Sequence, residues 1–104
     1  TAMGTDEYVN WSTHASVENV IKELRKGGFT IYALETTTHS IDISKTKFKK
    51  PCALILGNEA LGISEETLKI ADEIIQIPLS GWKNSLNVGV CAAISCYEIS
   101  RQWK

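Results

Sequence analysis

The chain has 104 residues and a formal net charge of −1, with 43% hydrophobic and 22% charged residues. This length allows one small domain of ordinary globular composition, and so small a net charge gives no overall signal for binding nucleic acid. No apolar run approaches the ~20 residues that span a bilayer, and no basic-then-apolar secretory signal is present. We therefore expect no membrane partner and a location in the cytoplasm or an organellar interior.

The three cysteines, Cys52, Cys91 and Cys96, lie among apolar residues and are odd in number. Such cysteines are typical of small, reduced core side chains rather than of a disulfide framework. The two histidines, His14 and His39, have no cysteine or carboxylate at the spacing of a metal site. We therefore predict neither a disulfide framework nor a bound metal.

The first quarter of the chain contains one clear helical pattern. Residues 1–11 show no period, and we interpret them as a loop or a short helical turn. From Ser16, apolar residues recur at the spacing of one helix face, and Gly27-Gly28 is a typical stop signal. The apolar face consists of Val17, Val20, Ile21 and Leu24. The sequence therefore predicts an amphipathic helix that ends at this glycine pair.

A strand and a long connection follow. Residues 29–34 are β-branched, aromatic or apolar without alternation, which predicts a strand buried on both faces. Residues 35–50 form a connection in which Ile41 and Ile43 are expected to attach to the body of the domain. The dense positive cluster of this connection consists of Lys45, Lys47, Lys49 and Lys50. Such a cluster is either a solvated surface or a contact for RNA phosphates.

The second half of the chain predicts two more strands and two more helices. Residues 52–56 and residues 73–77, or as far as 79, are apolar runs typical of buried strands. Ser64 is a suitable N-cap for a short helix between them, with Glu65 and Glu66 in its first turn. Residues 85–103 predict a long helix rich in small side chains. This order of elements indicates an α/β fold with parallel strands joined by crossovers.

Both second-half strands end in polar loops that contain glycine, at Gly57 and at Ser80-Gly81. Such loops indicate a ligand site at the carboxyl edge of a parallel sheet. Gly57 would permit a close approach to its backbone that a Cβ would block. Taken one by one, neighbouring residues have simpler roles: Asn58 as a turn residue, Glu59 as a surface charge and Ser85 as a helix cap. The amide of Asn87, in apolar surroundings, must bond either to a loop or to a ligand.

Two stretches resemble the signature motifs of a known family. LGNEALGI begins at Leu56 and IPLSGWKNSLNVGVCAAI begins at Ile77. They closely resemble the second and third motifs of the SpoU/TrmH family of RNA ribose 2′-O-methyltransferases, which belong to the SPOUT class. The matching residues are Gly57, Glu59, Ile77, Pro78, Gly81, Ser85, Leu86, Asn87, Val88 and Val90. Agreement over two motifs in order is highly specific, and the resemblance extends over essentially the whole chain.

The resemblance implies an α/β fold with a mostly parallel sheet, flanking helices and a C-terminal trefoil knot that binds S-adenosylmethionine. Residues 1–104 would form a partial methyltransferase domain acting on tRNA or rRNA, with a homodimer formed partly through the last helix. The cofactor-binding residues implied are Gly57, Asn58, Glu59, Ile77, Leu79, Ser85, Leu86 and Asn87. Among these, Glu59, Ser85 and Asn87 would support catalysis by surrounding the methionine end and the incoming ribose.

The chain also departs from the family pattern. Nothing between Thr1 and Trp11 resembles the first motif, whose arginine is thought to assist deprotonation of the ribose hydroxyl, and neither Arg25 nor Arg101 can take that role. We therefore expect the domain to lack its N-terminal strand–helix unit and to transfer methyl groups poorly by itself. Two alternatives remain: a non-catalytic cofactor-binding or dimerisation remnant, and a flavodoxin-like module whose Gly57 loop cradles phosphate.

Overall fold

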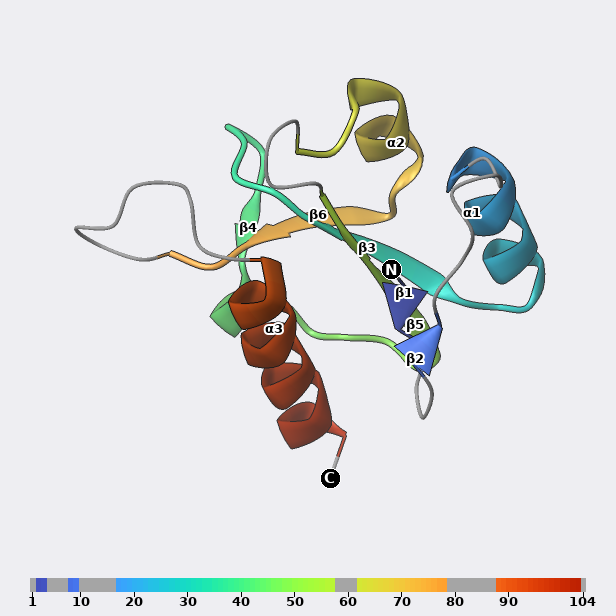
Figure 1. Ribbon diagram of the computed structural model, residues 1–104. Helices are drawn as coiled ribbons and strands as arrows, with labels where there is room; N and C mark the ends of the chain where they lie inside the picture. The colour runs from blue at the N-terminus through green and yellow to red at the C-terminus, as the bar shows by residue number, and fades with distance from the viewer. Residues whose placement is uncertain (1, 4–7, 10–16, 58–61, 79–87, 104) are drawn as a thin grey trace.

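A parallel sheet lies at the centre of the structure (Figure 1). The structure is a computed structural model, and it describes residues 2–3, 8–9, 17–57, 62–78 and 88–103. The strands lie in the order β4-β6-β3-β5, and every neighbouring pair is parallel. Their bounds are β3 Thr30–Leu34, β4 Ile41–Asp42, β5 Cys52–Leu56 and β6 Glu73–Gln76. The predicted α/β class with parallel strands is confirmed.

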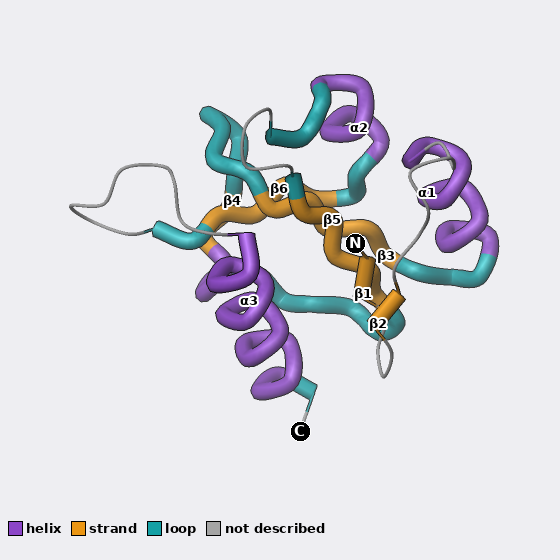
Figure 2. Tube along the Cα trace, viewed as in Figure 1, coloured by secondary structure: helices purple, strands orange, loops and turns teal. Residues whose placement is uncertain are grey.

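Helices cover both faces of this sheet (Figure 2). On one face, α1 (Val17–Lys26) and α2 (Glu65–Ile70) pack over alternate side chains of β3 and β5. The opposite face is covered by α3, Val88–Gln102. The short helix α2 begins where predicted, because the Ser64 hydroxyl accepts a hydrogen bond from the Thr67 N–H at 3.2 Å. Within the described residues, no helix is both long and apolar enough to cross a membrane.

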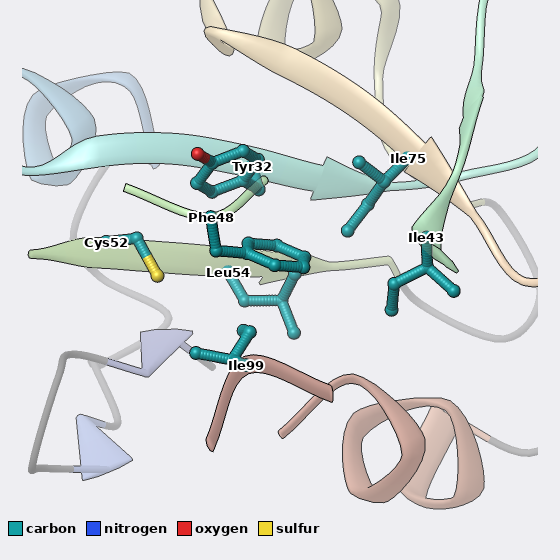
Figure 3. Close-up of a cluster of buried hydrophobic side chains, with 7 residues drawn as sticks. All are labelled: Tyr32, Ile43, Phe48, Cys52, Leu54, Ile75 and Ile99. Carbon is teal, nitrogen blue, oxygen red and sulfur yellow. The ribbon is translucent and has the colours of Figure 1, made fainter. Parts of the chain in front are cut away.

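The side chains of β3 alternate between two buried clusters, one on each face of the sheet. Ile31 and Ala33 pack toward α1 and α2, whereas Tyr32, between them, packs toward α3. All three side chains are fully buried, which confirms the prediction of a strand covered on both faces. Figure 3 shows the α3-side cluster, which consists of Tyr32, Ile43, Phe48, Cys52, Leu54, Ile75 and Ile99.

The structure corrects two sequence interpretations. The loop expected near the amino terminus contains a short antiparallel pair, β1 (Ala2–Met3) and β2 (Tyr8–Val9), with β1 beside β5. The connection 35–50 contains β4, which pairs with β6, and a 3-10 turn, Ile43–Lys45. Strands of two residues are too short for a sequence period, so neither was predicted. Ile43 is buried as expected, but the Ile41 side chain is 42% exposed and this residue attaches through backbone pairing.

The segment 46–50, here called the strap, crosses the α3 face of the sheet and is held by side chains from other elements. Gln102 donates to the Thr46 carbonyl at 2.7 Å and accepts from the Phe48 N–H at 2.9 Å. The Trp103 indole donates to the Phe48 carbonyl at 3.1 Å. The Tyr32 hydroxyl accepts from the backbone N–H of residue 49 at 2.9 Å. These bonds satisfy the backbone of a segment that has no strand partner of its own.

A carboxylate supports the Gln102 side chain from one turn earlier on α3. Glu98 accepts from Gln102 at 2.8 Å and from both guanidinium nitrogens of Arg101 that face it, at 3.0 and 2.7 Å. These hydrogen bonds lower the pKa of Glu98 to about 2. The Glu98 side chain is only 15% exposed, so this network holds the Gln102 amide in a fixed orientation.

We expect Gln102→Ala to lower the free energy of unfolding by about 1–3 kcal/mol, because the substitution leaves two partly buried backbone groups of the strap without partners. Ser100→Ala, at an exposed position on the same helix, is the control and should change stability by less than about 0.5 kcal/mol. Urea denaturation measures both. Equal stability of the two variants would contradict the role assigned to Gln102.

Candidate active site

The carboxyl ends of β5, β3 and β6 lie side by side at one edge of the sheet. Leu34 is in register with both Leu56 and Ile75, so the chain leaves these strands at adjacent points. The residues that follow the strands at this edge are Gly57, Glu35 and Ile77. Of the two loops predicted at this edge, the one that begins at Gly57 is present there, whereas Ser80-Gly81 lies outside the described residues.

Gly57 lies where the chain approaches itself closely. A Cβ at this position would be 2.7 Å from the carbonyl carbon of Gly62 and 3.0 Å from the Ile63 side chain. Gly62 has a φ of +69°, a conformation that favours glycine. The two glycines therefore close the base of a loop that contains residues 58–61. Within the described residues, the group that approaches Gly57 closely is the backbone of Gly62, and the predicted approach of a ligand stays a prediction.

Glu35 holds the other side of this loop base and was not singled out from the sequence. One of its carboxylate oxygens, Oε1, accepts a hydrogen bond from the Ile63 N–H at 3.2 Å. A Cβ on Gly62 would lie only 2.3 Å from the same oxygen, so the carboxylate occupies the space that a larger residue would need. The sequence signal that could have identified Glu35 was an acid directly after an apolar strand, at the edge where the other polar loops begin.

An apolar ledge borders the same edge. Leu34, Leu56 and Ile77 come from the ends of three neighbouring strands and pack against the α3-side cluster. Each of the three side chains is only partly buried, and they lie at the edge where Glu35 and Gly57 follow their strands. This combination of apolar surface and a few polar groups is typical of sites for small organic ligands.

The remaining predicted site residues divide into two groups. Asn58, Glu59, Leu79, Ser85, Leu86 and Asn87 lie outside the described residues. The four lysines of the connection 35–50 are all exposed, and Lys45 precedes the strap whereas Lys47, Lys49 and Lys50 lie on it. Lys45 lies in the turn after β4, near the carboxyl edge, whereas Lys50 precedes β5 and is near the opposite edge.

Of the three cysteines, Cys52 is a buried core residue, whereas Cys91 and Cys96 are partly buried. Burial raises the pKa of the Cys52 thiol to about 11, and burial also raises the pKa values of Cys91 and Cys96. All three are free thiols, in agreement with the sequence interpretation. Among the described residues, no group of three or more His, Cys, Asp or Glu side chains lies together in a way that could hold a metal ion.

Comparison with known proteins gives relatives of one kind. A tRNA (guanosine(18)-2'-O)-methyltransferase of Thermus thermophilus is 36% identical over 102 residues, which are 98% of this chain and 53% of that protein. The enzyme of the same name from Escherichia coli is 33% identical over 101 residues, covering 97% of this chain and 44% of the relative. The chain thus spans about half the length of the curated relatives it matches.

Solved structures agree with the sequence relatives. The TrmH/SpoU tRNA modifying enzyme of A. aeolicus has 37% identity and a TM-score of 0.76, over 84% of this chain and 44% of that one. An AdoMet-bound rRNA methyltransferase from Sinorhizobium meliloti has 29% identity and a TM-score of 0.73, over 82% of this chain and 33% of that one.

A family model gives the assignment directly. Residues 1–97 match the model described as the SpoU rRNA Methylase family. The match includes β3, β5, β6 and their carboxyl edge, together with both motif stretches. Family membership also favours a methyltransferase-type site over the flavodoxin-like alternative. The chain belongs to the SpoU rRNA methylase family.

Proposed function

We propose that this chain is the cofactor-binding portion of an S-adenosylmethionine-dependent ribose 2′-O-methyltransferase that acts on tRNA or rRNA. The observation that carries the proposal is the closed Gly57–Gly62 loop base beside the apolar ledge, at the carboxyl edge of a sheet that matches SpoU methylases. Relatives named as tRNA 2′-O-methyltransferases and a structural neighbour described as AdoMet-bound support the same reaction.

The described residues fit such a cofactor. The ledge of Leu34, Leu56 and Ile77 offers an apolar surface suited to the faces of a purine base. When bound, S-adenosylmethionine supplies a methyl group already activated by its sulfonium charge. The task of the protein is then to bind and orient the cofactor and to align the ribose oxygen of the substrate.

The finer assignments follow from the family resemblance. We place the backbone of Gly57, Ile77 and Leu86 at the adenosine, with Leu79 lining the pocket. Around the methionine end and the incoming ribose we place Asn58, Glu59, Ser85 and Asn87, of which Glu59, Ser85 and Asn87 support catalysis. The stretch after β6 would form the trefoil knot, with α3 tucked through it. This role would place the protein with its RNA, in the cytoplasm or an organellar interior.

We expect the chain to bind S-adenosylhomocysteine, the demethylated cofactor, in calorimetry and Gly57→Ala to abolish that binding. The added methyl group would collide with the Gly62 backbone and open the loop base. Gly27→Ala is the matched control, because its Cβ would meet its nearest neighbour at 3.4 Å. Circular dichroism should show that both variants are folded. Full affinity in folded Gly57→Ala would contradict the assignment of this loop.

Methyl transfer is tested with labelled S-adenosylmethionine and transcripts of tRNA and rRNA. A ribose 2′-O-methyl group makes the adjacent phosphodiester resistant to alkali, so the label should be recovered in an alkali-resistant dinucleotide. Label on a base would contradict ribose methylation. Cofactor binding without any transfer, even after addition of a segment with the first family motif, would favour the non-catalytic alternative.

We also propose that the lysines along the strap contact RNA phosphates. The strap alternates between buried and exposed residues, with Thr46 and Phe48 buried and the lysines exposed. Its backbone is fixed by Gln102, Trp103 and Tyr32, so the lysines project from a rigid base. Within the described part of the chain, none of these lysines forms an ion pair with an acid. Lys50 instead lies over the Trp103 ring, 5.2 Å from its centroid.

We expect Lys47→Ala/Lys49→Ala to weaken RNA binding to a similar degree for different sequences and to reduce the salt dependence of affinity. Each lost phosphate contact should lower the slope of log K against log salt by roughly 0.7–0.9. Lys22→Ala/Lys69→Ala removes the same charge from exposed positions on α1 and α2, over the opposite face. Equal salt slopes for the two double variants would contradict a specific role of the strap.

Self-association is the third part of the proposal. Tyr97 of α3 is 70% exposed, the most exposed large hydrophobic side chain within the described residues. An exposed aromatic residue on a helix suits an interface between two copies of the chain, as the family resemblance implies. We expect sedimentation to show a dimer that Tyr97→Glu dissociates, whereas Lys22→Glu, on α1, should have no effect. A wild-type monomer at high micromolar concentration would contradict this proposal.

A further inference from the structure

Glu35 is fixed at the end of the central strand through its backbone. Its N–H donates to the Ile75 carbonyl at 2.9 Å, and its own carbonyl accepts from the Ser40 hydroxyl at 2.5 Å. The same Ser40 oxygen accepts from the Thr37 N–H at 2.8 Å, which closes the turn after β3. The starting point of the Glu35 side chain is therefore set by β6 on one side and by this turn on the other.

The Glu35 side chain extends to the neighbouring strand connection. Its carboxylate accepts from the Ile63 N–H at 3.2 Å and fills the space beside Gly62. Ile63 directly precedes the N-cap of α2, and Gly62 packs against Gly57. One carboxylate thus joins the end of β3 to the closing end of the loop that follows β5.

An exposed acid can contribute to solubility alone, but the contacts of Glu35 indicate that it holds two segments of the structure together. The residue is partly buried, and its carboxylate fills the space beside Gly62, where a φ of +69° favours glycine. Gly62 with a φ of +69° and the Gly57 contact define a single arrangement of the loop base. Within the described residues, the side-chain hydrogen bond to the backbone of this loop base comes from Glu35.

We propose that Glu35 is a positioning residue that clamps Gly62 and Ile63 to the end of β3 and so holds Gly57, which packs against Gly62, in its cofactor-binding position. The inference rests on the proposed function, because the loop is assigned to S-adenosylmethionine there. What Glu35 contributes is an acceptor oxygen at a set position. Its negative charge is not required for this task, since a side-chain amide also presents an oxygen to an N–H donor.

The test compares Glu35→Ala with Glu35→Gln in calorimetry with S-adenosylhomocysteine. Glu35→Ala should weaken binding about 10-fold, as expected for loss of one hydrogen bond. Glu35→Gln should restore affinity to within about 3-fold of wild type, because the oxygen remains. Glu66→Ala, an exposed acid on α2, is the control for the change of charge and should bind normally. Wild-type affinity in Glu35→Ala, or equally weak binding by both Glu35 variants, would overturn the clamp.

A second measurement separates failure of the clamp from failure of the proposed function. Amide hydrogen exchange without cofactor should show faster exchange at Ile63 in Glu35→Ala, because its N–H loses its acceptor. The Leu68 N–H, bonded to the Ser64 carbonyl at 3.0 Å, should exchange as in wild type. Unchanged exchange at Ile63 overturns the clamp whether or not the protein binds cofactor. A wild-type chain that fails to bind S-adenosylhomocysteine overturns the proposed function instead.

Discussion

The structure depends on the burial of β3, which has parallel partners on both sides and helices over both faces. Every backbone group of such a strand must find a partner inside the protein. At the amino end of β3, the pairing with β6 starts only at Tyr32. The backbone of Ile31 is instead satisfied by Asp72. The Asp72 carboxylate accepts from the Ile31 N–H at 2.6 Å, and the Asp72 N–H donates to the Ile31 carbonyl at 2.8 Å. At the carboxyl end, Glu35 bonds to β6 and to the loop after β5.

The carboxyl edge of the sheet and the face that α3 covers have different features. The carboxyl edge has the glycine loop base and the apolar ledge, where we propose that the cofactor binds. The α3 face has the strap, whose backbone bonds to Gln102 and Trp103 of the last turn of the chain. The helix α3 holds the strap, and its first turns also belong to the motif stretch that begins at Ile77.

Much of the fold could be predicted because its signals are local. The apolar run around β5, the Ser64 cap and the apolar face of α1 each depend on neighbours in the sequence, and each element is present. The placement of Gly57 at the carboxyl edge followed from the parallel arrangement. β4 was missed because its pairing with β6 depends on backbone geometry rather than on a pattern of side chains. Ile41 illustrates this, since it is a strand residue with an exposed side chain.

The sequence by itself determined the α/β class, the order of the main elements and the family, because strand burial, helix caps and two ordered motifs are written in consecutive residues. Only the tertiary structure decided which distant groups complete the site. Glu35 bonds to a residue 28 positions away, and Gln102 bonds to one 54 positions away. Such contacts leave no period or spacing in the chain. They exist because folding brings unpaired backbone groups of one segment next to the polar side chains of another, where each must be satisfied.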